Sequence, residues 1–170
     1  MIKFEKVSFE QFKKDWEKIF GSFHETDLKK IYKNIKLPQR ATEGSAGYDF
    51  FSPITLTVNP EDYVLVPTGI RFVSDLSPES HIVLMIYPRS GLGFKYGMRL
   101  INSTGVIDQD YQFAANEGHI MAKFTSEKVF ELKQGEAFCQ GIITQYLVTD
   151  DDSENVKDKR TGGFGSTTKI

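Results

Sequence analysis

The chain has 170 residues and a mass of 19.3 kDa, the size of one domain that can bury a core of its own. A net charge of −2 excludes nucleic-acid binding by bulk electrostatics, and a single cysteine excludes a disulfide framework and a Cys-rich zinc site. Because no apolar run approaches a membrane span and the start is Lys/Glu-rich, we expect a cytoplasmic protein that binds no membrane.

The first 36 residues carry a helical pattern. Ser8 followed by Gln11 is a capping-box signal, aromatic residues then recur at helical spacing, and Gly21 ends the run. A weaker helical pattern covers about residues 26–33. We interpret residues 1–36 as a helical extension whose aromatic face packs on the main domain or on a neighbouring subunit. The alternative is a helix that docks another protein.

From Leu37 onward, short runs rich in Val, Ile, Phe and Tyr alternate with turn residues. No long helix interrupts them, so the pattern indicates an all-β fold over residues 37–149, a sandwich or a jelly-roll-like β-barrel. The expected strands are 48–51, 54–58, 63–66, 70–74, 81–87, 120–124 and 138–148. Residues 150–170 lose the apolar pattern and are predicted to form a mobile, Gly-rich C-terminal arm.

Five short segments carry side chains more specific than a β-fold requires. The run Gly105–Tyr111 leads two β-formers directly into an acid, and as an extended strand it would place Asp108 and Asp110 on one side and Tyr111 on the other. Residues 88–93 supply a cation, a hydroxyl and two glycines after an apolar strand, which would let backbone N–H groups approach a phosphate. The other segments are 46–49, 135–141 and 160–168.

In order and spacing, these segments resemble the five motifs of the trimeric dUTP pyrophosphatase (dUTPase) family, over about residues 37–170. The resemblance implies hydrolysis of dUTP to dUMP and pyrophosphate, by in-line attack of water on the α-phosphorus with Mg²⁺ bridging the triphosphate. Such an activity keeps uracil out of DNA and supplies dUMP for thymidylate synthesis. The resemblance also implies a homotrimer with active sites shared between subunits.

The resemblance assigns the nucleoside end of the site to the third motif. Asp108 matches the general base that deprotonates the attacking water. Tyr111 matches the residue whose ring packs against the deoxyribose and leaves no space for a 2′-hydroxyl. Asn102, Gly105 and Ile107 belong to the hairpin that would read the uracil edge.

The phosphate end is assigned to other motifs. Arg89, Ser90 and Gly91 match the phosphate-binding second motif, and Gln140 matches the amide that reaches the α-phosphate region. Asp49 matches the first-motif acid, which acts on Mg²⁺ through water and does not ligate it directly. Mg²⁺ held mainly by substrate oxygens and water suits its hydrated character. The three histidines fall at no metal-ligand spacing.

The last segment completes the implied site. Phe164 would stack over the uracil, while Arg160, Ser166 and Thr167 would close on the γ-phosphate. Ordering such an arm over the ligand would exclude water, so the arm is expected to act as a lid.

Two stretches depart from the family's pattern: residues 1–36 have no counterpart in it, and residues 112–118 lengthen the hairpin after Tyr111. Two other functions stay open. One is a dCTP deaminase, which shares this fold. The other is a nucleotide-gated binding module, which would contact a protein partner through the N-terminal helix or residues 112–118. Cys139 is interpreted as a small core residue, because no paired histidine or second cysteine is visible.

Overall fold

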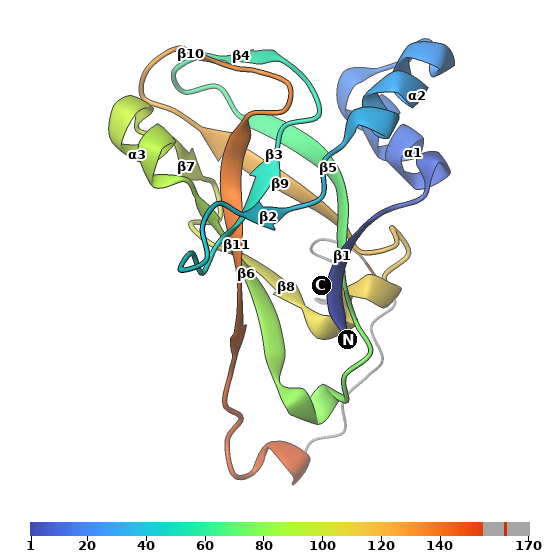
Figure 1. Cartoon of the computed structure of the whole chain (residues 1–170), viewed down its shortest axis with the longest axis vertical. Coiled ribbons are helices and arrows are strands. Elements are labelled where there is room, and N and C mark those ends of the chain that lie inside the picture. The colour runs from blue at the N-terminus through green and yellow to red at the C-terminus, as the bar shows by residue number, and fades with distance from the viewer. Residues whose placement is uncertain (155–161, 163–170) are drawn as a thin grey trace.

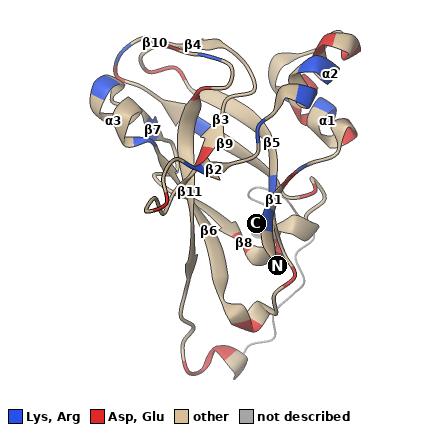
Figure 2. Cartoon of the chain, in the orientation of Figure 1, with Lys and Arg blue, Asp and Glu red and all other residues tan. Residues whose placement is uncertain are grey.

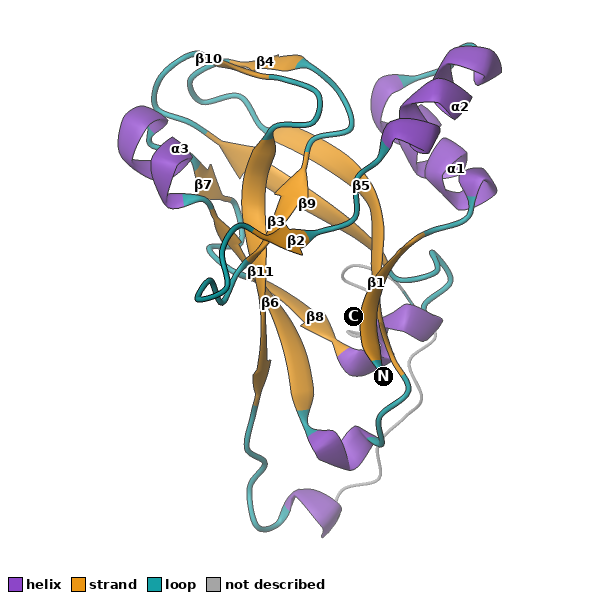
Figure 3. Ribbon diagram, in the orientation of Figure 1, coloured by secondary structure: helices purple, strands orange, loops and turns teal. Residues whose placement is uncertain are grey.

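The computed structural model describes residues 1–154 and 162, and strands make up most of its regular structure (Figure 1, Figure 3). The strands are β1 (Ile2–Lys6), β2 (Gln39–Arg40), β3 (Tyr48–Phe51), β4 (Leu56–Val58), β5 (Val64–Ser74), β6 (Ile82–Pro88), β7 (Arg99–Leu100), β8 (Gly105–Asp108), β9 (His119–Thr125), β10 (Phe130–Leu132) and β11 (Ala137–Gln145). The helices are α1 (Phe9–Phe20), α2 (Glu25–Asn34) and α3 (Ser90–Tyr96), with 3₁₀ turns η1 (Pro78–Ser80), η2 (Gln109–Phe113) and η3 (Asp152–Glu154). The predicted β class is confirmed.

In the described residues the strands form three sheets and no closed barrel. One sheet has the order β1-β5-β9-β7, the second has the order β2-β3-β11-β6-β8, and the third pairs β10 with β4. Strand β8 pairs with β6, and β7 pairs with β9 through two residues only. Among the described residues, no hydrogen-bonded ladder joins β8 to β9. The predicted jelly-roll-like barrel is therefore wrong in one respect, because the sheets do not close into a barrel.

Strand β5 replaces two of the predicted strands, 63–66 and 70–74. Its register against β9 shifts between Pro67 and Ile70, where Gly69 has a φ of 73°. A Cβ atom on Gly69 would lie 2.4 Å from Cδ1 of Ile35, so glycine is required both for the bend and for the close approach of the segment that follows α2.

Helix α1 occupies Phe9–Phe20, where the sequence pattern predicts a helix of about a dozen residues. The Ser8 hydroxyl accepts a hydrogen bond from the backbone N–H of Gln11 at 3.1 Å, and Gly21, with a φ of 80°, ends the helix. Phe12 and Trp16 point into the same core cluster as the strand residues. Figure 1 shows α1 and α2 together beside β5. The first helix is therefore packed on the sheet within its own chain.

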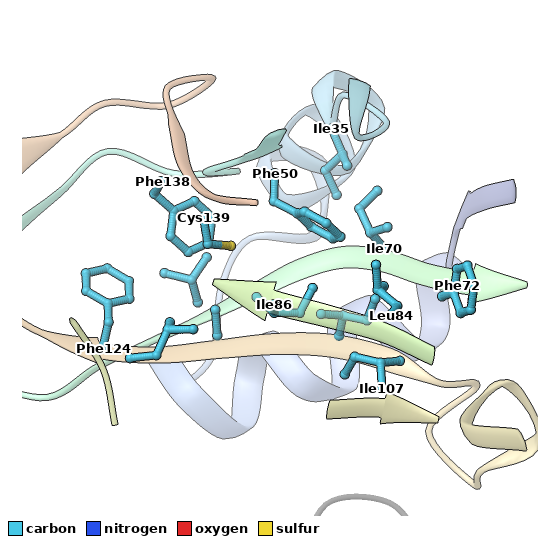
Figure 4. Packing of buried hydrophobic residues seen from close by; sticks show 14 of the residues in the cluster. Ile35, Phe50, Ile70, Phe72, Leu84, Ile86, Ile107, Phe124, Phe138 and Cys139 are labelled. Carbon is cyan, nitrogen blue, oxygen red and sulfur yellow. The ribbon is translucent and has the colours of Figure 1, made fainter. Parts of the chain in front are cut away.

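The core lies between the two larger sheets. Figure 4 shows Phe50, Leu84, Phe124 and Phe138 gathered there, and all four are fully buried. Cys139 lies among them, and burial raises the pKa of its thiol well above the ordinary range. The interpretation of Cys139 as a core residue is therefore confirmed.

Charges of both signs alternate over α1 and α2 (Figure 2). Glu25 accepts from Lys13 and Lys29, each at 2.7 Å, and these hydrogen bonds hold the pKa of Glu25 at about 2. Exposed pairs of this kind contribute little to stability, so the packing of the helices depends on their buried faces. Among the helices described, none combines the length and apolar character needed to cross a bilayer.

Candidate active site

Strand pairing brings three of the predicted phosphate-end residues together. In the second sheet, Gln140 on β11 lies opposite Asp49 on β3 and opposite Tyr87 on β6, and Arg89 directly follows β6. The Arg89 guanidinium Nε lies 3.1 Å from Asp49 Oδ1, and the two side chains are 42% and 15% exposed. A cation is therefore fixed just after the end of β6, an interior strand of the sheet, with part of its surface open to solvent.

Gln140 is held by close contacts of its side-chain amide. Its Nε2 donates a hydrogen bond to the Pro88 carbonyl at 3.3 Å. A Cβ atom on Gly47 would lie 2.3 Å from Gln140 Oε1, so a side chain at position 47 would displace the amide. The glycine before β3 therefore makes room for Gln140.

Ser90 and Gly91, which the sequence predicts to bring backbone N–H groups near a phosphate, form the first turn of α3. Both residues are exposed, and the helix ends at Gly97, which has a φ of 65°. Gly91 and Gly93 lie within the helix, and the chain leaves it at Gly97, whose left-handed backbone suits glycine. The second motif is thus a strand end followed by a short helix.

The predicted uracil-binding residues Asn102, Gly105 and Ile107 line one pocket of about 860 Å³, whose walls are mostly apolar. The pocket lies where β8 and β9 are not joined by a ladder. Further lining residues come from α1, β5 and β9: Asp15, Lys18, Ile19, Phe20, Val64, Leu65, Met121, Ala122 and Lys123. This volume is within the range of pockets that bind small molecules.

Asp108 lies at the exposed end of β8, opposite Val83 of β6. Because side chains alternate along a strand, Asp108 and the buried Ile107 are on opposite faces of β8. Asp108 is not among the described residues that line the pocket. Asp108 therefore shares β8 with Gly105 and Ile107 but not their face, and Asn102 lies before the strand.

Tyr111 lies in η2 and is only 4% exposed. Its hydroxyl donates to the His119 carbonyl at 3.1 Å and accepts from Asn116 Nδ2 at 2.8 Å. The prediction that Asp108, Asp110 and Tyr111 share one extended strand is wrong, because β8 ends at Asp108 and a 3₁₀ turn begins at Gln109. In place of a longer hairpin arm, residues 112–118 continue this turn into a compact loop.

The two ends of the predicted site are separated within one chain. Asp108 is opposite Val83, whereas Arg89 follows Pro88, five residues further along β6. At about 3.3 Å per residue, this separation along the strand is about 17 Å. The predicted residues therefore form two groups in a single chain.

Four predicted site residues, Arg160, Phe164, Ser166 and Thr167, lie outside the described residues. Within residues 1–154 and 162, no three His, Cys, Asp or Glu side chains gather as a metal site would require.

The family model for dUTPase matches residues 33–168 of the chain. The chain belongs to the dUTPase family. The deoxyuridine 5′-triphosphate nucleotidohydrolase of Lactococcus lactis is 44% identical over 142 residues, which cover 80% of this chain and 91% of the relative. Curated members of the dUTPase family that match this chain carry that enzyme name, so the chain is a dUTP diphosphatase by family.

Solved structures agree with this assignment. The dUTPase of Streptococcus mutans has a TM-score of 0.62 and 30% identity, covering 87% of this chain and 98% of that one. The dUTPase of phage phi11 of S. aureus, described with a structural Mg(II) ion, shares the fold at a TM-score of 0.61 and 15% identity, covering 88% and 94%. The dUTPase-like fold of the chain is therefore established.

The contacts that surround the third motif are not predicted by the sequence. Asp15 and His119 form a buried pair, with Asp15 Oδ2 2.6 Å from His119 Nδ1, and Glu117 binds Ser8. No local pattern signals these contacts, because each joins residues more than a hundred positions apart. The capping-box pattern at Ser8 marks the start of α1 but not its second partner.

Proposed function

We propose that the chain hydrolyses dUTP to dUMP and pyrophosphate, by in-line attack of water on the α-phosphorus with Asp108 as general base. Membership of the dUTPase family supports the reaction. The exposed position of Asp108 at the end of β8 supports the role of the carboxylate, because a base must reach solvent water. This activity would keep uracil out of DNA and supply dUMP.

The observation that carries the proposal is the Asp49–Arg89–Gln140 group. A guanidinium that is always charged and partly exposed can bind phosphate oxygens through charge-assisted hydrogen bonds. Asp49 orients it from the protein side. Ser90 and Gly91, exposed beside Arg89, would add donors to the phosphates, and Gln140 would reach the α-phosphate.

The pocket beside β8 is proposed to receive the base. Its mostly apolar walls suit a flat ring, and Asn102 with the backbone at Gly105 and Ile107 would supply polar groups for the uracil edge. A site with such groups rejects cytosine, because the inverted donor pattern would leave buried polar groups unpaired. Tyr111 would close the sugar side against a 2′-hydroxyl.

The residues fit a Mg²⁺ ion that arrives with the substrate. In the described residues no cluster of ligands forms a protein cage, and Mg²⁺ is commonly held by substrate phosphates, water and one or two carboxylates. Asp49 would hold water ligands of the ion. Such an ion would neutralise charge along the triphosphate.

Separation of the two groups supports a site shared between subunits. Because about 17 Å of β6 lies between them, a triphosphate bound by Arg89 of one chain would meet Asp108 of another. We therefore propose a homotrimer, whose mass in solution by light scattering would be three times 19.3 kDa. The arm at residues 150–170 is proposed to close the site through Arg160, Phe164, Ser166 and Thr167, and the cytoplasm is the proposed location.

The decisive experiment measures pyrophosphate release from dUTP, dCTP, dTTP and UTP, with and without Mg²⁺. Release confined to dUTP and stimulated by Mg²⁺ is the expected result. Ammonia released from dCTP would indicate a deaminase instead. Binding of dUTP without turnover of any nucleotide would indicate a nucleotide-gated binding module.

A further inference from the structure

Helix α1 is joined to the loop after the third motif by its N-cap. The Ser8 backbone N–H donates to Glu117 Oε2 at 2.7 Å, and the Ser8 hydroxyl donates to Glu117 Oε1 at 2.6 Å. Ser8 lies outside the region matched to the family, and Glu117 lies in the stretch that departs from its pattern. The two unusual parts of the chain therefore bind each other.

A second, buried contact lies about two turns further along α1. His119 is 0% exposed, and its Nε2 accepts the Gly69 backbone N–H at 2.8 Å. A backbone amide can only donate, so the imidazole proton is on Nδ1, which donates to Asp15 Oδ2 at 2.6 Å. Gln11 Nε2 also donates to Asp15 Oδ2, at 2.7 Å. This network fixes the orientation of the His119 ring.

His119 is in turn connected to Tyr111. The Tyr111 hydroxyl donates to the His119 carbonyl, and Asn116 Nδ2 donates to the Tyr111 hydroxyl. The Gly118 N–H donates to Asn116 Oδ1 at 3.2 Å. A continuous set of hydrogen bonds thus runs from α1 to η2.

The loop between η2 and β9 has a backbone that needs such support. Glu117 has a φ of 58°, in the left-handed region that residues with a Cβ rarely adopt, and Gly118 has a φ of 73°. A Cβ on Gly118 would lie 2.8 Å from the Tyr111 carbonyl oxygen, so the loop folds tightly back on η2. Because the Glu117 carboxylate binds Ser8, α1 stabilises this conformation.

We propose that α1 is a positioning element of the active site: by holding Glu117 and His119, it fixes η2 and with it Tyr111 and Asp108. Asp108 is the residue that directly precedes η2, so movement of η2 would move the proposed base. The inference rests on the proposed dUTP hydrolysis, because it assigns α1 a part in that reaction. Ser8 is a positioning residue that acts through Glu117, and Asp15, which also lines the pocket, acts on η2 through His119.

The test replaces the two contacts separately, with Asp15→Ala and Glu117→Ala. We expect each variant to have a lower kcat for dUTP. We also expect a lower preference for dUTP over UTP, measured as the ratio of the two kcat/KM values, and in Asp15→Ala this ratio should fall on the order of tenfold. Asp15→Asn keeps an oxygen that can accept from His119 Nδ1 and should recover most of the ratio. Loss of folding alone would not change the preference between two nucleotides that differ in one hydroxyl.

The matched control is Val58→Ala, a buried residue of β4 outside this network. It should lower the melting temperature while keeping the dUTP-to-UTP ratio of the wild type. An equal loss of ratio in Val58→Ala, or an unchanged ratio in both test variants, would overturn the inference.

A second measurement does not depend on activity. Hydrogen exchange of the backbone amides at 109–119 should become faster in Asp15→Ala and Glu117→Ala but not in Val58→Ala, and unchanged exchange would overturn the inference. If the wild type does not hydrolyse dUTP, the proposed function fails, and the exchange result alone then decides whether α1 holds η2.

Discussion

The two ends of the candidate site are built in different ways. At the phosphate end, Asp49, Arg89 and Gln140 come from adjacent strands of one sheet, and their positions follow from the ladders that join β3, β11 and β6. At the nucleoside end, Asp108 is the last residue of the edge strand β8, and Tyr111 lies in the 3₁₀ turn η2 that follows it. That turn is held by a helix from the start of the chain.

Because the two ends are built differently, different substitutions should affect them. A residue inside a paired sheet is fixed on both sides by backbone hydrogen bonds, so the phosphate end should respond to changes in its own side chains. An edge strand has one paired side, so the nucleoside end should respond both to its own residues and to distant supports.

Asp108→Asn should have the largest effect and should act on kcat. Loss of a general base lowers the rate by about 10²–10⁴-fold, whereas the KM for dUTP should change little because the amide keeps the shape of the side chain. Steady-state pyrophosphate release measures both constants. Asp110→Asn is the control, since Asp110 is an exposed neighbour in η2, and an equal loss in both variants would contradict the role of Asp108.

Arg89→Ala should raise the KM for dUTP more than it lowers kcat. A hydrogen bond to a charged group contributes about 1.5–3 kcal/mol, so kcat/KM should fall by roughly 10- to 150-fold. The control is Arg99→Ala, which removes an exposed arginine paired with Glu127 at 3.5 Å and should keep the wild-type constants. A wild-type KM in Arg89→Ala would show that Arg89 does not bind the phosphates of dUTP.

Gly47→Ala tests whether the phosphate end is sensitive to a single methyl group. The new Cβ would lie 2.3 Å from Gln140 Oε1, which is too close, so the amide would have to move. Because a small displacement of a substrate-binding group lowers the rate, kcat/KM for dUTP should fall by roughly a few-fold. Gly44→Ala is the matched control, because a Cβ there meets nothing within 4 Å. If both variants keep full activity, the position of Gln140 is not important for the reaction.

The smallest effect concerns stability in acid. Burial alone would raise the pKa of Asp15, but hydrogen bonds from His119 and Gln11 outweigh it and hold the pKa below its ordinary value of 3.8. This pairing therefore stabilises the fold above about pH 4, and the contribution is lost as the pH falls below 3.8 through the folded pKa. Melting temperature should fall more steeply with acid in the wild type than in Asp15→Asn. Parallel curves would contradict the prediction.

The sequence predicts local structure better than assembly. The ends of α1 are readable, because Ser8 and Gly21 act on backbone groups next to them. The runs at 48–51 and 120–124 are readable as strands, since each is a short run in which aromatic or other apolar residues predominate. Closure of the barrel cannot be predicted from the sequence, because it depends on whether β8, which already pairs with β6, also pairs with β9.

The candidate site shows the same limit. The family resemblance predicts that Asp49, Arg89 and Gln140 belong to one end of the site. In the structure these three residues lie close to one another. The resemblance could not reveal that Asp15 contacts His119, since residues 104 positions apart leave no periodic signal.

The bond from Ser8 to Glu117 has a consequence for synthesis on the ribosome, where chains grow by about 5–20 residues per second. Glu117 is made 109 residues after Ser8, so the N-cap of α1 waits roughly 5 to 20 s for its second partner at that rate. During that interval the face carrying Phe12 and Trp16 has neither β9 nor His119 to cover it. Helix α1 therefore completes its packing only after β9 has been made.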